Sequence, residues 1–112
     1  MTTRTATFAR RRFTVENIAG QDVRLHQGSP FCDPTGEAPI ELPFVTEKIS
    51  ERRSHGTCIV DGYYYEVNYY PHNYASTGEN WYVLGVEDEH GTEIHYSEHR
   101  TIEDAKAYAA LI

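Results

Sequence analysis

The sequence of 112 residues lacks the features of membrane-inserted and secreted proteins. It has no apolar run near the roughly 20 residues that a transmembrane helix needs, and no apolar signal segment follows Met1. Its two cysteines, Cys32 and Cys58, are too few for a disulfide framework, so reduced thiols are expected, with a bridge between the two as the alternative. These absences predict a cytoplasmic protein without a membrane partner.

The sequence also lacks the common catalytic signatures. It contains no glycine-rich phosphate loop and no local Ser/His/Asp signature. Two weaker arrangements exist: Glu93, His95 and His99 could form a metal site on one side of an extended chain, and His55 could act as a base toward Cys58. Neither has a spacing typical of such sites, and the histidines are expected to be solvated. We predict no catalytic residue, metal or cofactor.

Basic residues are scarce in the second half of the chain. The net charge is −7, yet residues 1–56 carry +1, whereas residues 57–112 have two basic and ten acidic side chains and carry −8. All nine tyrosines lie in residues 57–112 as well. Because phosphates must be met by cations, this balance disfavours direct contact with nucleic acid. Acid and tyrosine concentrated together indicate an interaction surface for a basic partner.

Alternating polar and apolar residues predict three β-hairpins. The first joins residues 12–16 to residues 22–26 through a turn at Gly20. The second joins residues 57–60 to residues 63–70 through Asp61-Gly62, a dipeptide typical of a type I′ turn. The third joins residues 81–87 to residues 92–97 through a loop that contains Gly91.

The remaining segments are a loop, an ambiguous stretch and a helix. Residues 28–43 contain four of the five prolines and predict an extended surface loop. Residues 44–53 fit both a short helix and a strand, and the helix is the favoured interpretation. A helix is expected to begin at Thr101, with its apolar stripe packed on a sheet. We predict a single domain over residues 1–112, an α+β fold in which an antiparallel sheet of four to six strands packs against a C-terminal helix.

The strand patterns also predict which side chains face the helix. In residues 63–69 the side of Tyr65 and Val67 is the expected core face, and Leu84 and Ile94 are expected to join it. The opposite face would then present an aromatic and acidic surface that includes His95. The predicted contact residues on or beside this surface are Tyr64, Glu66, Tyr70, Trp81, Glu87, Asp88, Glu89 and Glu93.

Two interpretations of this surface stay open. The tyrosines could be structural, since tyrosine and tryptophan favour strands and the N-terminal hairpin could pack over them. Alternatively the surface binds a partner, because aromatic residues anchor protein interfaces and acidic residues among them suit arginines.

In its size, in the charge of residues 57–112 and in the acidic, tyrosine-rich hairpins from Tyr63 to Glu98, the chain resembles a class of small acidic proteins. These are the inhibitors that phages and plasmids use against host defence, of the anti-CRISPR and anti-restriction type. The resemblance is one of general character and transfers no individual residue. It implies a non-catalytic inhibitor that occupies a basic, nucleic-acid-handling protein in the host cytoplasm, with carboxylates in place of phosphates. The alternatives are a small metal- or thiol-dependent enzyme and a structural or regulatory domain whose tyrosines form the core.

Overall fold

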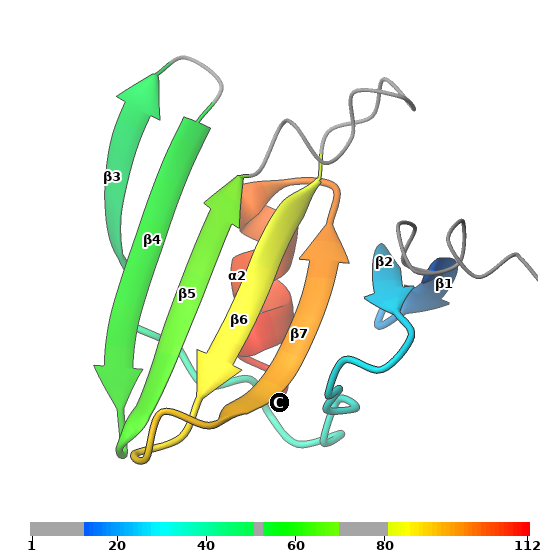
Figure 1. Cartoon of the computed structure of the whole chain (residues 1–112), viewed down its shortest axis with the longest axis horizontal. Coiled ribbons are helices and arrows are strands. Elements are labelled where there is room, and N and C mark those ends of the chain that lie inside the picture. The colour runs from blue at the N-terminus through cyan, green and yellow to red at the C-terminus, as the bar shows by residue number, and fades with distance from the viewer. Residues whose placement is uncertain (1–12, 51–52, 70–80) are drawn as a thin grey trace, which may run out of the picture.

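The structure is a computed structural model that describes residues 13–50, 53–69 and 81–112. Its described elements are β1 (Phe13–Ile18), β2 (Gln21–His26), β3 (Val45–Ser50), β4 (Arg53–Val60), β5 (Tyr63–Tyr69), β6 (Tyr82–Glu87), β7 (Glu93–His99) and α2 (Ile102–Ala109). The strands form one antiparallel sheet in the order β1-β2-β7-β6-β5-β4-β3, with α2 packed on one face (Figure 1). The predicted α+β class is confirmed, with seven strands where four to six were expected.

The three predicted hairpins form, and their turns have the expected backbone. Asp61 and Gly62 have φ angles of 52° and 83°, which is the left-handed pair that a type I′ turn requires. Ala19 and Gly20 have φ angles of 54° and 82°, and Gly91 has a φ of 79°. These turns match the right-handed twist of the strands that they join.

The prediction of a helix over residues 44–53 is wrong. The stretch contains β3, which lies at the edge of the sheet and pairs with β4, starting at Val45 opposite Thr57. A helix of two or three turns is marginal by itself, whereas β4 supplies a ready row of backbone partners. Val45 is β-branched and 75% exposed, so it suits an edge strand.

Helix α2 begins as predicted. The side chain of Thr101 accepts a hydrogen bond of 3.0 Å from the backbone N–H of Asp104, which caps the first turn. Ala105, Tyr108 and Ala109 are buried against the sheet. The sheet side of this core consists of Val23, Val67, Leu84 and Val86. No helix in the described ranges is long and apolar enough to cross a lipid bilayer.

The proline-rich loop of residues 28–43 has no regular structure, as predicted, but it is tied to the domain at several points. Thr35 and Ile40 donate backbone hydrogen bonds of 2.8 and 3.0 Å to the carbonyls of Leu111 and Ala110. The Pro30 carbonyl accepts a bond of 2.8 Å from the N–H of Tyr96 in β7. The loop therefore passes beneath the C-terminal end of α2 (Figure 1). Both cysteines are free thiols.

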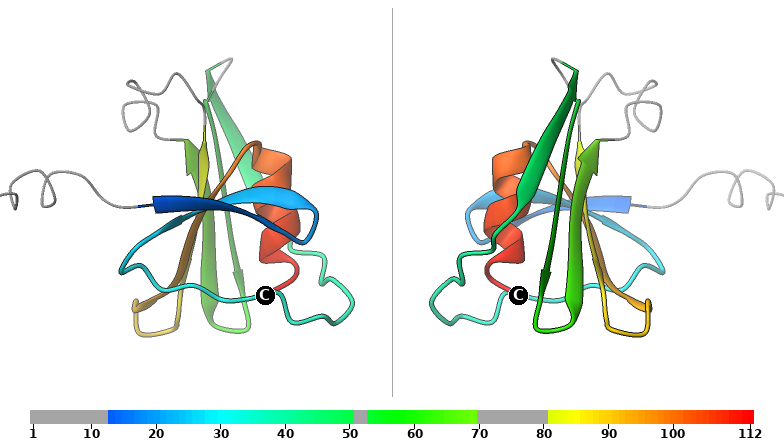
Figure 2. Two further views of the ribbon diagram at one scale, coloured as in Figure 1. Left: turned by 90° about the vertical axis from the view of Figure 1, so that its right-hand side faces the viewer. Right: turned by 90° about the vertical axis from the view of Figure 1, so that its left-hand side faces the viewer.

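The β1–β2 hairpin lies crosswise to the other strands (Figure 2). It joins the sheet at two registered pairs, in which Val23 and Arg24 lie opposite His99 and Glu98 of β7. Its turn end reaches α2, where the Gln21 side-chain amide donates a hydrogen bond of 3.0 Å to a helix carbonyl. Its other end lies on the far side of the sheet, so the hairpin wraps around the sheet edge at β7.

Candidate functional site

Strands β4 to β7 have one face on the side of α2, which packs on β5, β6 and β7. We call the opposite face, which is turned toward the viewer in Figure 1, the open face. The predicted core face of β5 is confirmed, because Val67 and Tyr69 are buried while Tyr64 and Glu66 alternate with them. Along the register, the open face includes Thr57, Ile59, Tyr64, Glu66, Val83, Gly85, Tyr96 and Glu98.

The predicted faces of β7 are reversed. Leu84 and Val86 point toward α2, and they lie opposite Ser97 and His95 respectively. His95, Ser97 and His99 consequently point into the core and have no exposed surface. The polar residues can occupy the core face because each finds hydrogen-bond partners there. His95 is therefore no part of the open face, and neither His95 nor His99 is solvated as expected.

A hollow of about 110 Å³ lies in the middle of the open face. We use the name hollow for this cavity together with the residues that line it. These residues are Tyr64, Glu66, Val83, Gly85, Val86, Glu87, Glu93 and Tyr96. Four of the predicted contact residues, namely Tyr64, Glu66, Glu87 and Glu93, meet there. Gly85 and Tyr96 were not predicted.

Gly85 accounts for the depth of the hollow. It lies in β6 between Glu66 of β5 and Tyr96 of β7, its registered neighbours. A Cβ atom built on Gly85 would meet no atom of the described residues within 4 Å, so the space above it is open among them. Any larger residue would project into this space. A glycine in a strand often marks a place where a ligand approaches, which a lone glycine in a sequence pattern only weakly signals.

The register brings two glutamates together at one side of the hollow. A shift in the β6–β7 pairing between Val86 and Glu87 places Glu93 directly opposite Glu87. Like charges in directly opposite positions destabilise an antiparallel pair. The fold thus retains an unfavourable concentration of negative charge here, as expected if a cation is to be attracted.

Glu66, the third carboxylate of the hollow, and the neighbouring Tyr64 are partly exposed. Burial and the carboxylates of Glu66 and Glu87 raise the pKa of the Tyr64 phenol. Glu66 Oε2 lies 2.8 Å from Nε2 of His55, and these side chains are 35% and 31% exposed. Water therefore reaches this pair, and its stabilising contribution is small.

Asp88 and Glu89 lie outside the hollow, in the adjoining β6–β7 turn. Asp88 Oδ1 accepts hydrogen bonds of 2.9 and 3.0 Å from the backbone N–H groups of His90 and Thr92. These bonds lower the pKa of Asp88, so this carboxylate also stabilises the turn. Together with Asp61 of the neighbouring turn, both acids border a second concavity of about 230 Å³.

The predicted exposure of Trp81 is wrong, because its side chain has no exposed surface. The guanidinium carbons of Arg24 and Arg100 lie 5.5 and 4.4 Å from the ring centroid. Phe13 of β1 covers Arg24 at 3.7 Å, so the N-terminal hairpin buries this end of the open face. Covering by the hairpin was one of the two interpretations, and it holds for this end. Tyr70, another predicted contact, lies outside the described residues.

The buried end of the open face also neutralises its own acid. Glu98 is 1% exposed, and its Oε1 lies 3.1 Å from Nε of Arg24 and 2.7 Å from Nε2 of His26. Its Oε2 accepts a hydrogen bond of 3.2 Å from the Tyr96 hydroxyl. A buried carboxylate needs such partners to remain in the fold. The charge available to a partner is therefore concentrated at the hollow and the adjoining turns.

The residues weighed for metal or thiol chemistry do not come together. Among the described residues, no group of three histidine, cysteine or acidic side chains is placed to hold a metal ion. His95 and His99 are buried, whereas Glu93 is exposed beyond the pairing shift. Cys58 lies on the helix face with a pKa raised by burial, and His55 lies on the open face beside Glu66.

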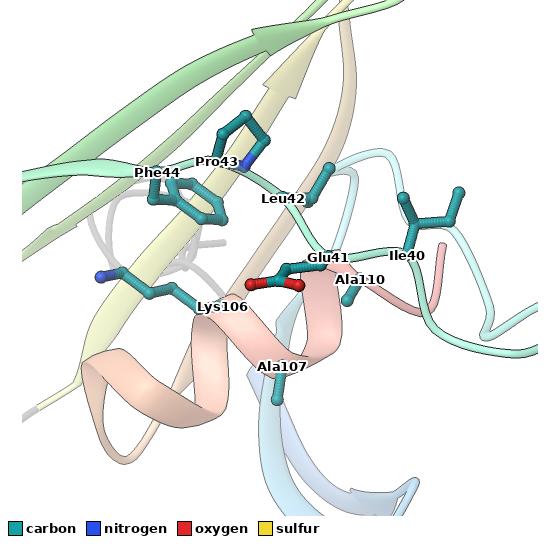
Figure 3. Close-up of a pocket in the computed structure, with 8 residues that line it drawn as sticks. All are labelled: Ile40, Glu41, Leu42, Pro43, Phe44, Lys106, Ala107 and Ala110. Atoms are coloured by element: carbon teal, nitrogen blue, oxygen red, sulfur yellow. The ribbon is translucent and has the colours of Figure 1, made fainter.

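A further groove lies on the helix side of the sheet, between residues 40–44 and α2 (Figure 3). Its volume is about 440 Å³, and Leu42 and Phe44 contribute apolar walls. The ammonium group of Lys106 lies 5.6 Å from the Phe44 ring centroid and donates a hydrogen bond of 2.5 Å to Thr46 Oγ1. None of the predicted contact residues that the structure describes borders this groove.

Comparison of the chain with protein-family models, with curated proteins and with solved structures gave no match. A functional assignment therefore depends on the geometry of the open face.

Proposed function

We propose that this protein is a non-catalytic inhibitor that binds a basic, nucleic-acid-handling protein through the hollow and the adjoining turns. In this proposal the chain occupies a surface on which the partner would hold phosphates, in the manner of anti-CRISPR and anti-restriction proteins. The observation that carries it is the gathering of three glutamates and two tyrosines around Gly85 on a face that α2 leaves open.

The side chain best suited to the hollow is an arginine of the partner. A guanidinium group is planar, forms paired hydrogen bonds with carboxylates and stacks on aromatic rings. The hollow offers carboxylates from Glu66, Glu87 and Glu93 and rings from Tyr64 and Tyr96. A cation bound there would also relieve the repulsion between Glu87 and Glu93, so part of the binding free energy would come from that relief.

The charge of the whole chain supports the same assignment. A net charge of −7 attracts a basic protein over about one Debye length, which increases the rate of encounter. The same charge repels nucleic acid, so we propose no direct contact with DNA or RNA. Such a partner places the site of action in the cytoplasm of the host cell.

The alternative of a small enzyme receives less support from the site. The Cys58 thiol has a pKa raised by burial, which keeps it protonated and makes it a poor nucleophile. His95 and His99 are enclosed in the core, where a substrate could reach them only after local opening. The alternative of a structural or regulatory domain, in which the tyrosines serve only the core, does not explain why acidic residues gather at the hollow.

The proposal is tested by capturing partners from lysate of the natural host with three tagged proteins. These are the wild type, a triple variant of the hollow and a matched triple variant of exposed acids elsewhere. The hollow variant carries Glu66→Gln, Glu87→Gln and Glu93→Gln, and the matched variant carries Glu16→Gln, Glu37→Gln and Glu41→Gln. Both variants have the same net charge, so a difference between them reports the position of the charge.

We expect the wild type and the matched variant to retain a basic nucleic-acid-binding protein that the hollow variant loses. The purified partner should then release its nucleic acid when the wild-type chain is added, and its affinity for the chain should fall as salt increases. Equal capture by both triple variants would contradict the proposal, since net charge alone would then explain binding.

A second variant tests the hollow without changing any charge. Gly85→Val adds a side chain that projects into open space and suits a strand, so the fold should be retained. We expect it to block the hollow and reduce partner affinity at least tenfold. Unchanged affinity for Gly85→Val would place the contact outside the hollow.

A further inference from the structure

A continuous chain of hydrogen bonds runs through the core beneath α2. The backbone N–H of Cys32 lies 2.8 Å from Nδ1 of His95, and Nε2 of His95 lies 2.6 Å from the Ser97 hydroxyl. That hydroxyl lies 2.7 Å from Nε2 of His99, and Nδ1 of His99 lies 2.7 Å from Oε1 of Gln21. We call these five residues the histidine chain.

The two ends of the histidine chain require the same direction of donation. The Cys32 N–H donates to Nδ1 of His95, so a neutral His95 carries its proton on Nε2 and donates to Ser97. The Ser97 hydroxyl then donates to Nε2 of His99, which leaves the His99 proton on Nδ1 to be donated to Gln21. At the other end, the side-chain N–H of Gln21 donates a hydrogen bond of 3.0 Å to the carbonyl of Asp104. This bond leaves the side-chain oxygen of Gln21 facing His99.

The histidine chain joins four segments, of which β2 and the loop are distant in sequence from β7 and α2. Cys32 belongs to the loop of residues 28–43, the histidines and Ser97 belong to β7, Gln21 begins β2, and the last acceptor belongs to α2. Tyr108 of α2 reinforces the loop contact, since its hydroxyl donates 2.9 Å to the carbonyl of Cys32. The histidine chain thus connects the loop of residues 28–43 and the β1–β2 turn to the sheet and to α2.

An added proton disrupts this arrangement. On His95 it would face the N–H of Cys32, and on His99 it would face the hydroxyl hydrogen of Ser97, which would have to turn away and give up its own acceptor. Of the described groups that hydrogen-bond to the two rings, none is an anion. The titratable groups around them on the packed elements are Cys32 and Asp33 of the loop, Tyr82 of β6, Glu98 of β7, and Asp104 and Tyr108 of α2. The nearest carboxylate in sequence, Glu98, lies on the opposite face against Arg24.

We propose that the histidine chain is an acid-operated latch, which holds the loop of residues 28–43 and the β1–β2 turn in place when both rings are neutral and releases them when either ring is protonated. Release would free the tether at the Cys32 amide and the tether from Gln21 to α2. It would also uncover the groups that pack on the histidine rings, Phe31 and Tyr108. The inference does not depend on the proposed partner.

The protonation equilibria support this direction. Burial lowers the pKa of His95 to about 4. Burial together with the charge of His95 lowers the pKa of His99 to about 3, against a smaller raising effect of the Glu98 carboxylate. In the open state both rings return toward the ordinary histidine pKa of about 6.5. The open state therefore binds more protons between about pH 6.5 and pH 4, so opening becomes more favourable as the pH falls through this window. For both rings together, the opening equilibrium should increase on the order of a few hundredfold from about pH 7 to pH 5.

The test is amide hydrogen exchange at a series of pH values, corrected for the intrinsic exchange rate. We expect the amides of Cys32 and Tyr96, which bond to His95 and to the Pro30 carbonyl, to lose protection below pH 6.5 before Leu84 in β6 does. The double variant His95→Asn, His99→Asn should lack this pH dependence because neither replacement titrates. His90→Asn, at an exposed turn, should retain it.

A second measurement on the wild type avoids any difficulty in folding the variant. Ring nitrogen chemical shifts at neutral pH should show His95 protonated on Nε2 and His99 protonated on Nδ1. Two different neutral tautomers are what the direction of the hydrogen bonds requires. The inference is overturned if either ring is charged at pH 7, if both rings carry the proton on the same nitrogen, or if Cys32 and Leu84 lose protection in parallel as the pH falls.

Discussion

The two faces of strands β5 to β7 differ in whether their polar side chains find favourable partners within the fold. On the helix face, His95, Ser97 and His99 have no contact with water and form a complete chain of neutral hydrogen bonds. On the open face, Glu87 and Glu93 lie opposite each other with the same charge. The hydrogen bonds of the histidine chain stabilise the folded state, whereas the repulsion between Glu87 and Glu93 destabilises it. A face whose charges oppose folding is the better candidate for binding.

Neighbouring residues of β7 show the same contrast along one strand. Ser97 joins two imidazole rings beneath α2, whereas the adjacent Tyr96 borders the hollow and the adjacent Glu98 is paired with Arg24. Matched substitutions on the two faces can therefore separate stability from binding.

The largest expected effect is that of Ser97→Ala. This substitution leaves the Nε2 atoms of both His95 and His99 buried without their partner, and each such loss costs about 1–3 kcal/mol. We expect the free energy of unfolding to fall by about 2–4 kcal/mol in urea denaturation at pH 7. The matched open-face substitution Thr57→Ala should change it by no more than about 1 kcal/mol, the span of strand propensity. Equal losses for both variants would remove the proposed contrast between the faces.

A smaller effect is expected for Tyr108→Phe. The Tyr108 hydroxyl is buried and donates to the Cys32 carbonyl, so its removal should cost about 1–2 kcal/mol in thermal or urea unfolding. Tyr64→Phe on the open face should leave stability within about 0.5 kcal/mol of the wild type. The same open-face substitution should weaken partner binding only modestly, because the ring remains in the hollow.

The smallest expected effect has the opposite sign. Glu93→Gln removes one member of the like-charge pair with Glu87 and should stabilise the fold by about 0.2–1 kcal/mol. Partner affinity should fall in the same variant, so stability and binding would move in opposite directions. Glu37→Gln, at an exposed position of the loop, should change neither quantity measurably. A loss of stability on Glu93→Gln would show that this carboxylate serves the fold.

The hairpins and the helix start were predictable because their signals are local. The Asp61-Gly62 turn and the Thr101 cap each depend on a few adjacent residues, whose backbone preferences decide the structure. The β5 core face was predictable for a similar reason, since Val67 in an alternating run marks it. The stretch of residues 44–53 carried no such signal, and pairing with β4 decided the structure of β3 within it.

The predictions that were wrong depended on contacts between residues far apart in the sequence. His95 and His99 were placed on the wrong side because their partners, Cys32 and Gln21, lie more than sixty residues away in the chain. Trp81 was expected to be exposed because its cover comes from the N-terminal hairpin. The depth of the hollow depends on the register that sets Gly85 between two long side chains, and no single strand pattern contains that register.

The most direct test of the central claim is an amide chemical-shift titration of the wild-type chain with a short arginine-rich peptide, at low and at high salt. We predict that the largest shifts at low salt lie around the hollow, at Tyr64, Glu66, Gly85, Glu87 and Glu93, and that Gly85→Val abolishes them. Shifts spread equally over the acidic residues of the loop, β1 and α2, or shifts that survive in Gly85→Val, would contradict the claim that the hollow is the binding site.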